Sequence, residues 1–176
     1  MLVPLLCKEG EWHVVVTLRT QSVEHHKGQM SFPGGACDSK DADAKATALR
    51  ETYEEIGVRP EAVEVLGALD DFRTITSFVV TPFVGVIPHP FPYRLNSDEV
   101  EAVVEVPLAF LRDPAHLRVE SLEYEGRMFE VLFWDYGSDP DTTYTIWGAT
   151  ARILKDFLDR DIGPVNGARG TKDAEG

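Results

Sequence analysis

The chain has 176 residues, of which 43% are hydrophobic, and its formal net charge is −13. This length and apolar content fit one domain with its own core and are short for two. Such an acidic surface repels phosphate backbones, so nucleic acid is not an expected partner.

The chain begins with an apolar segment that is interrupted by Lys8 and Glu9, which is typical of a first strand and not of a signal peptide. Because the chain opens directly into this strand, we expect a few native residues to precede it. No apolar run approaches the length of a membrane span, so no membrane partner is expected. Cys7 and Cys37 do not suggest a disulfide framework, so we expect packed thiols in a reducing cytoplasm.

Apolar and β-branched segments predict most of the strands. A polar loop is expected over 20–28, and three prolines between 88 and 92 mark an irregular connection. A Glu-Gly-Arg turn at 125–127 predicts a β-hairpin. The expected strands are residues 1–6, 12–18, 63–69, 78–87, 100–106, 119–124 and 128–134.

Two amphipathic helices are predicted, over 42–56 and 145–159, with a short helical turn at 107–111. In the second helix Trp147 falls on the same stripe as Ala151, Leu154 and Leu158, so we expect it in the core. Many strands with two helices predict an α+β fold, a mixed β-sheet sandwiched between helices (α/β/α) with an added β-hairpin. The sequence after 160 is rich in glycine and charge and is predicted to be a disordered tail.

The helix over 42–56 has an apolar stripe at about 100° per residue. Every third or fourth position is apolar, so we expect this stripe to be buried. Its members are Ala42, Ala46, Leu49, Tyr53 and Ile56. Gly57 is a fitting helix terminator, and Asp41 or Asp43 can cap the first turn.

Glu51, Glu54 and Glu55 share the side opposite to this stripe. Like charges on neighbouring turns cost roughly a few tenths of a kcal/mol per pair, and the helix dipole disfavours anions in the last turn by about 0.3–1 kcal/mol each. Arg50 relieves part of this cost by pairing with Glu54 at i, i+4. Two interpretations are open: a solvated helix face, or a set of oxygen ligands for a hard divalent cation such as Mg²⁺.

A glycine-rich turn, Phe32-Pro33-Gly34-Gly35, precedes the helix. Its glycines permit positive φ and a close approach of the backbone. The carbonyl groups of such a turn can join a metal site, and its amides can face phosphate. This turn stands about 15 residues before an Arg-Glu-x-x-Glu-Glu-x-Gly sequence, and the combination favours a cation site over a solvated face.

With this loop and helix the chain resembles the Nudix hydrolases, whose sequence box combines a glycine, a glutamate and an Arg-Glu-x-x-Glu-Glu-x-Gly segment. The matching residues are Gly35, Arg50, Glu51, Glu54, Glu55, Gly57 and Val58. The gap from Gly35 to Arg50 is one residue longer than in the usual box. No glutamate occupies the middle position, where Asp41 lies nearby, and Thr52 replaces the usual aliphatic residue. The resemblance implies a Nudix fold and a Nudix domain over 1–160.

The longer gap is similar to that of the coenzyme A diphosphatases, a subgroup whose loop often carries two aspartates, here Asp38 and Asp41. The upstream signature of that subgroup corresponds to "VVTLRTQSVEHHKGQMSFPGG", in which Arg19 and Gly28 stand at the right intervals before Phe32. The second arginine of the signature is replaced by Glu24, and Thr20 replaces a smaller residue.

The resemblance implies that Mg²⁺ or Mn²⁺ bridges the oxygens of a diphosphate while water attacks phosphorus in line. Glu51 and Glu55 are then the best metal ligands, with Glu54 in the cluster and the carbonyl group of Gly35 completing the site. Arg50 orients the glutamates by pairing with them.

Further roles are assigned by position in the same way. Glu99, in a loop before a predicted strand, is favoured over Asp98 as general base, and the implied catalytic residues are Glu54, Glu99 and Arg50. Phosphate or other substrate contacts are expected from Arg19, His26, Gly28 and Arg73, although His26 can equally be an ordinary surface histidine.

Three functional hypotheses follow from the resemblance. The first is a coenzyme A diphosphatase that releases phosphopantetheine and adenosine 3′,5′-bisphosphate. The second is a Nudix hydrolase of ADP-ribose or another nucleoside diphosphate derivative, which the change to Glu24 keeps open. The third is a Nudix module that binds a nucleotide without cleaving it, against which the intact glutamate set argues. The expected partner is a small diphosphate substrate, and a homodimer is possible.

Overall fold

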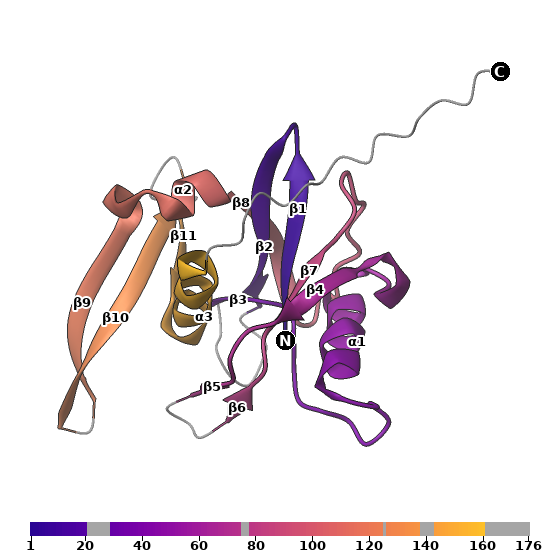
Figure 1. The fold of residues 1–176 in the computed structure, drawn as a ribbon, viewed down its shortest axis with the longest axis horizontal. Helices are drawn as coiled ribbons and strands as arrows, with labels where there is room; N and C mark the ends of the chain where they lie inside the picture. Colours follow the sequence, from indigo (N-terminus) through magenta and orange to yellow (C-terminus); the bar gives the residue numbers. More distant parts are fainter. Residues whose placement is uncertain (21–28, 75–77, 125, 138–142, 161–176) are drawn as a thin grey trace.

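A six-stranded mixed sheet forms the centre of the molecule (Figure 1). The computed structural model describes residues 1–20, 29–74, 78–124, 126–137 and 143–160. The strands run in the order β3-β2-β1-β7-β4, and β8 pairs with the other edge of β2. Only β1 and β7 run parallel in this sheet; the remaining pairs are antiparallel. The strands are β1 Leu2–Lys8, β2 Glu11–Arg19, β3 Met30–Ser31, β4 Glu64–Ala68, β7 Phe83–Val86 and β8 Val100–Pro107.

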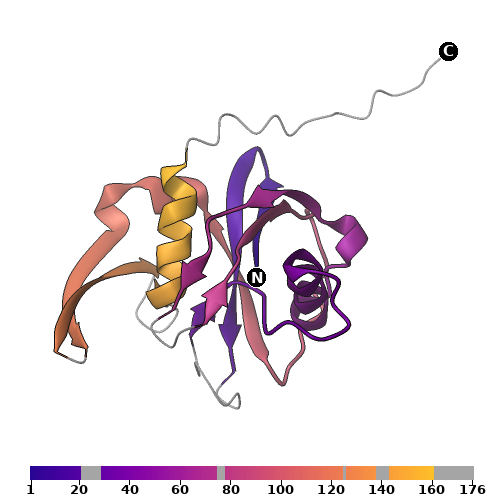
Figure 2. The ribbon, with the colours of Figure 1, turned by 60° about the horizontal axis from the view of Figure 1, so that its bottom comes forward.

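Helices α1 (Ala44–Ile56) and α3 (Gly148–Asp159) cover opposite faces of this sheet (Figures 1 and 2). Alternate side chains of a strand point to opposite faces, so β1 and β2 feed two cores. One core joins the sheet to Ile56 and Val58, and the other joins it to Leu154 and Phe157 of α3. The predicted α+β class with an α/β/α layering is therefore confirmed.

The predicted hairpin belongs to a smaller sheet of three strands, in the order β11-β10-β9, beside α3 (Figure 1). Strand β9 (Leu117–Tyr124) pairs antiparallel with β10 (Arg127–Tyr136), as the turn sequence predicts. Strand β11 (Tyr144–Trp147) pairs with β10 on its other side.

The prediction of a helix from residue 145 is wrong for its first three residues, which belong to β11. Trp147 pairs with Phe133 across the sheet, and their rings stack at 6.2 Å between centroids. Gly148, with a φ of 65°, then turns the chain into α3. Trp147 is 39% exposed and does not enter the core, where Phe157 is fully buried. An aromatic and β-branched segment fits a pleated surface, and pairing with β10 overrides its helical spacing.

Short elements complete the described chain. Helix α2 (Leu108–Arg112) follows β8, as predicted, and β5 (Phe72–Arg73) pairs with β6 (Val79–Val80) in a small ribbon. Short 3₁₀ turns lie at Pro60–Ala62 and Pro114–His116. Within the described ranges no helix has the length and apolar character needed to cross a bilayer. The predicted tail lies outside the described residues.

The caps of α1 are among those that the sequence predicts, but the helix begins at Ala44, two residues after the predicted start at 42. Asp43, one of the two candidate caps, accepts a hydrogen bond from the N–H of Ala46 at 2.7 Å. Gly57 ends the helix in the left-handed region with a φ of 79°. Caps of these types satisfy backbone groups that the helix itself leaves unpaired, so local sequence is sufficient to identify the candidate caps.

The face that α1 buries differs from the predicted stripe. Tyr53, expected in the core, is 49% exposed, whereas Glu55, expected on the exposed side, is only 1% exposed. The segment before β8 crosses the end of the helix, where the N–H groups of Arg94 and Asn96 donate to the carbonyl groups of Ile56 and Glu55. This segment therefore packs against the last helical turn, in which Glu55 and Ile56 are buried. The buried residues are Thr47, Ala48, Thr52, Glu55 and Ile56.

Candidate active site

The glycine-rich loop lies directly against the carboxylate of Glu51. A Cβ atom placed on Gly35 would stand 2.6 Å from the carboxyl carbon of Glu51, closer than side-chain atoms approach. Gly34, with a φ of 156°, adopts a conformation that side chains disfavour. Gly35 therefore allows the loop backbone and the helix to meet, and this contact confirms the close approach predicted from the sequence.

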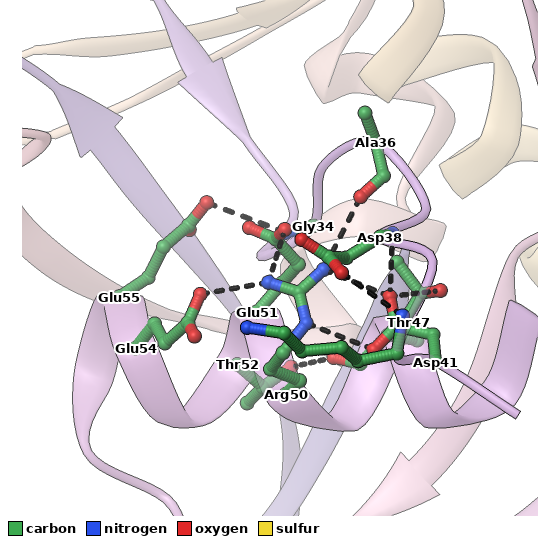
Figure 3. A network of polar contacts seen from close by, with 12 residues as sticks. Gly34, Ala36, Asp38, Asp41, Thr47, Arg50, Glu51, Thr52, Glu54 and Glu55 are labelled. Atoms are coloured by element: carbon green, nitrogen blue, oxygen red, sulfur yellow. Dashed lines mark hydrogen bonds and ion pairs between the residues drawn. The ribbon is translucent and has the colours of Figure 1, made fainter.

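Arg50 joins this loop to the acidic side of α1 (Figure 3). Its Nε and Nη2 donate to Oδ1 and Oδ2 of Asp41 at 2.9 and 3.0 Å, and Nη2 also donates to the carbonyl oxygen of Ala36 at 3.2 Å. Its Nη1 lies 2.7 Å from Oε1 of Glu51 and 2.8 Å from Oε2 of Glu54. The predicted pairing of Arg50 with glutamates is present, including the i, i+4 pair.

Asp41 has a larger role than the sequence suggested. Besides the guanidinium, its carboxylate accepts hydrogen bonds from the N–H of Asp38 at 2.8 Å and from the hydroxyl of Thr47 at 2.9 Å. The pairing with Arg50, followed by the Asp38 N–H, holds the pKa of Asp41 far below its ordinary value. Its position next to the gap left by the missing glutamate was the signal in the sequence for this role.

Glu55 is buried at the other end of the site with few partners. Its Oε1 accepts the N–H of Gly34 at 3.4 Å and lies 3.7 Å from Nη1 of Arg19 on β2, while Oε2 is buried and has no hydrogen-bond partner among the residues that the structure describes. Burial raises the pKa of Glu55 to about 7, against the opposing effects of Gly34 and Arg19, and the charges of Glu51 and Glu99 add to the increase. A buried carboxylate oxygen without a donor is rare and requires an explanation.

Glu99 is fixed near Glu55 by the segment that crosses the end of α1. The side-chain amide of Asn96 donates to Oε1 of Glu99 at 3.3 Å, and the N–H of Thr20 donates to the Glu99 carbonyl group at 2.9 Å. Glu99 is half-buried, whereas its alternative Asp98 is exposed. The structure therefore brings Glu99 into the environment of Glu55, where its charge adds to the raised pKa.

The remaining predicted residues divide into two groups. Arg19 joins the site through Glu55. Arg73 is exposed on β5, and within the described ranges no ion pair or side-chain hydrogen bond connects it to the glutamates. His26 and Gly28 lie outside the described residues.

The oxygen donors of the site fit a divalent cation. Glu55 offers an unpartnered carboxylate oxygen, the loop approaches Glu51 without an intervening side chain, and hard divalent cations take oxygen ligands. In the part of the chain that the structure describes, no three His, Cys, Asp or Glu side chains are already arranged as a metal cluster. The carboxylates of Glu51 and Glu54 turn instead toward Arg50.

Comparison with known sequences places this site in a family. The family model described as the NUDIX domain matches residues 1–123. A relative from Cronobacter sakazakii, described as an uncharacterized Nudix hydrolase NudL, is 38% identical over 157 residues, which cover 89% of this chain and 79% of the relative. A relative of the same description from Salmonella newport has the same identity and coverage. The chain therefore belongs to the Nudix hydrolase family, whose members use divalent metal cations.

Solved structures show the same fold. The MutT/nudix family protein from Enterococcus faecalis superimposes with a TM-score of 0.56 at 18% identity, over 92% of this chain and 61% of that one. The Ap4A hydrolase of C. elegans, in a binary complex, gives a TM-score of 0.53 at 17% identity, over 61% and 78%. The NUDIX domain of Shewanella oneidensis NrtR, complexed with ADP ribose, gives 0.50 at 22% identity, over 62% and 71%. At these identities the likeness is one of fold, and it confirms the predicted Nudix fold.

Proposed function

We propose that this Nudix hydrolase cleaves the diphosphate bond of coenzyme A or its derivatives, releasing phosphopantetheine and adenosine 3′,5′-bisphosphate. The observation that carries the proposal is the meeting of two motifs at Glu55. Arg19 comes from the upstream signature of the coenzyme A diphosphatases and Gly34 from the glycine-rich loop, and both contact its Oε1. Residues of both motifs therefore lie close together around Glu55 in the folded chain.

The proposed cation is Mg²⁺ or Mn²⁺, held by Glu51, Glu54 and Glu55 with the carbonyl group of Gly35. When bound, such a cation neutralises the diphosphate and lowers the pKa of a bound water. Arg50 keeps Glu51 and Glu54 on the side of the helix that faces the loop. These assignments rest on the unpartnered oxygen of Glu55 and on the chemistry of the donors.

Glu99 is the proposed general base, which takes the proton of the attacking water. Its support is its half-buried position near Glu55 and the hydrogen bond from Asn96, which limits the orientations of the carboxylate. Arg19 remains a proposed substrate contact because part of its side chain, 21%, stays exposed beside the site. The roles of His26, Gly28 and Arg73 in substrate binding remain predictions.

A second candidate is the hydrolysis of ADP-ribose or another nucleoside diphosphate derivative. The observation in its favour is Glu24, which replaces an arginine of the coenzyme A signature by an acid. If the arginine of the signature contacts a substrate phosphate, an acid in its place repels that phosphate. A binding module without catalysis is less well supported, because Arg50 and all three glutamates of the box are present.

The decisive experiment is turnover of a substrate panel by the purified protein with Mg²⁺ or Mn²⁺. Coenzyme A, an acyl-coenzyme A, ADP-ribose and a dinucleoside polyphosphate are compared, and mass spectrometry identifies the products. We expect coenzyme A or the acyl-coenzyme A to have the highest kcat/KM of the panel. The products from coenzyme A should be phosphopantetheine and adenosine 3′,5′-bisphosphate. A clear preference for ADP-ribose would select the second candidate. Measurable ligand binding without hydrolysis of any substrate would select the binding module.

The cellular location, the oligomeric state and the domain boundary also stay predictions. Cys7 is half-buried but Cys37 is exposed, so the prediction of packed thiols is wrong for Cys37, and the reducing cytoplasm stays a prediction. A homodimer is tested by light scattering during size-exclusion chromatography. The domain boundary near 160 is tested by limited proteolysis.

A further inference from the structure

The carboxylate of Asp41 is almost completely enclosed by hydrogen-bond donors. It accepts Nε and Nη2 of Arg50, the hydroxyl of Thr47 and the N–H of Asp38, all within 3.0 Å. Only 6% of its side chain is exposed. Bonds from helix, loop and guanidinium therefore leave this carboxylate a single orientation (Figure 3).

This fixed carboxylate determines the plane of the Arg50 guanidinium. An arginine has a long, mobile side chain, but two parallel N–H···O bonds to one carboxylate fix its planar fork. With Nε and Nη2 held by Asp41, the Nη1 corner points to Glu51 and Glu54. The positions of the two glutamates thus depend on an acid that touches neither of them in the described contacts.

The same clamp fixes the loop. Nη2 of Arg50 also donates to the carbonyl group of Ala36, the residue after Gly35, and Gly35 lies against the Glu51 carboxylate. Arg50 therefore binds Asp41 and the Ala36 carbonyl group of the same loop, and the loop backbone beside Ala36 lies against Glu51.

The two departures from the usual Nudix box balance each other at this position. The gap to Arg50 is one residue longer than usual, and the acid is an aspartate with one methylene fewer than glutamate. Asp41 nevertheless reaches Arg50 with both oxygens at 2.9 and 3.0 Å. The longer chain supplies the reach that the shorter side chain lacks.

We propose that Asp41 is a positioning residue, which orders Arg50 and through it the cation ligands of the catalytic helix. This inference rests on the proposed function, because it assumes that Glu51, Glu54 and Glu55 hold a divalent cation. Asp41 itself contacts neither cation nor substrate.

The test compares Asp41→Asn with a matched control, Asp43→Asn. Both remove one negative charge from the same segment, but Asp43 only caps α1, and asparagine caps a helix about as well as aspartate. In Asp41→Asn an amide N–H₂ replaces one acceptor, so the two-bond fork is lost. Binding of Mn²⁺ without substrate is measured by electron paramagnetic resonance, together with kcat, KM and Tm.

We expect Asp41→Asn to weaken Mn²⁺ binding and to lower kcat by about 10-fold, at the lower end of the 10–100-fold effect of losing a direct partner of a metal ligand, because Asp41 acts through Arg50. KM should change much less, because no substrate contact is removed. Asp43→Asn should keep the wild-type values. Asp41→Glu, which retains the charge, should lose less than Asp41→Asn.

Equal Mn²⁺ affinity and kcat in Asp41→Asn and Asp43→Asn would overturn the proposal, whatever the melting temperatures. If Asp41→Asn does not fold, Thr47→Val carries the test, since it removes one bond to Asp41 without changing any charge. A loss of Mn²⁺ affinity and kcat in Thr47→Val, smaller than that expected for Asp41→Asn, supports the proposal. Wild-type values of both quantities in Thr47→Val overturn it. A wild-type protein that binds no Mn²⁺ and cleaves no diphosphate overturns the proposed function and this inference together.

Discussion

Asp41 and Glu55 are two nearly buried carboxylates at opposite ends of the same site, and their surroundings differ in kind. Asp41 accepts four short hydrogen bonds, and its pKa lies far below the ordinary value. Glu55 accepts one long hydrogen bond, has one oxygen without a partner and a pKa raised to about 7. Native proteins rarely bury an unsatisfied carboxylate without a functional reason. The comparison therefore indicates that Asp41 has a structural role in the site, whereas Glu55 retains an oxygen that can bind a ligand.

The largest effect is expected from Glu55→Gln, which should lower kcat by about 1,000-fold or more. The change removes a proposed metal ligand while keeping the volume of the side chain, and loss of a ligand exceeds the 10–100-fold effect of losing its partner. Steady-state kinetics with saturating Mn²⁺ measure the loss, and Glu101→Gln, an exposed acid on β8, is the control. Near-wild-type activity in Glu55→Gln would remove this residue from the catalytic site.

The second prediction concerns the stability of the metal-free protein as a function of pH. A carboxyl group with an ordinary pKa of 4.5 and a folded-state pKa of about 7 stabilises the folded state at low pH, and this contribution is lost as pH rises through 7. Wild type should therefore lose up to about 3 kcal/mol relative to Glu55→Gln between pH 5 and pH 8.

The charges that face Glu55 come from several elements: Arg19, Glu51, Glu99 and the amino group of Met1. Urea denaturation of both proteins in EDTA at several pH values measures the difference in free energy of unfolding. Parallel pH profiles for wild type and Glu55→Gln would show that Glu55 is ionised throughout and would contradict the comparison with Asp41.

The third prediction is that a divalent cation stabilises wild type but not Glu55→Gln. A ligand at 100 times its dissociation constant adds about 2.7 kcal/mol to the folded state, which corresponds to a rise in Tm of several degrees for a domain of this size. Differential scanning calorimetry at pH 8 with Mn²⁺ and with EDTA measures the rise. Equal shifts in both proteins would locate the cation elsewhere.

The smallest effect is expected from Gly35→Ala. Its Cβ atom would stand 2.6 Å from the Glu51 carboxyl carbon, so the end of that flexible side chain must move while the backbone keeps its conformation. We expect about a tenfold loss of kcat with a Tm close to that of wild type. A large fall in Tm would instead show that Gly35 serves the fold.

Local patterns predicted much of the fold. The hairpin turn at Gly126, the cap at Asp43 and the terminator Gly57 each depend on neighbours in the chain, and all three occur as expected. The pairing of Arg50 with Glu54 also follows from helical spacing alone. The family resemblance, carried by residues of one loop and one helix, agrees with the family match and the fold.

The predictions that were wrong concern residues whose burial or pairing depends on segments distant in the sequence. Alanines and threonines around α1 left its hydrophobic stripe weakly defined, so Tyr53 was placed inside and Glu55 outside. The helical spacing of Trp147 was overridden by its pairing with Phe133. The sequence offers Asp41 as a helix cap, as a loop aspartate and as an acid near a missing glutamate, but not as the partner of Arg50, because that hydrogen bond depends on how the loop folds back.

The sequence by itself determined the identity of the acids and the caps of α1, because these depend on residue type and on neighbours within a few positions. Tertiary structure alone decided which of the acids is buried and which is paired. Burial of Glu55 arises where the segment 91–99, the glycine-rich loop and β2 meet over the last turn of α1. Desolvation depends on all the atoms around a group, and no spacing within the chain specifies it.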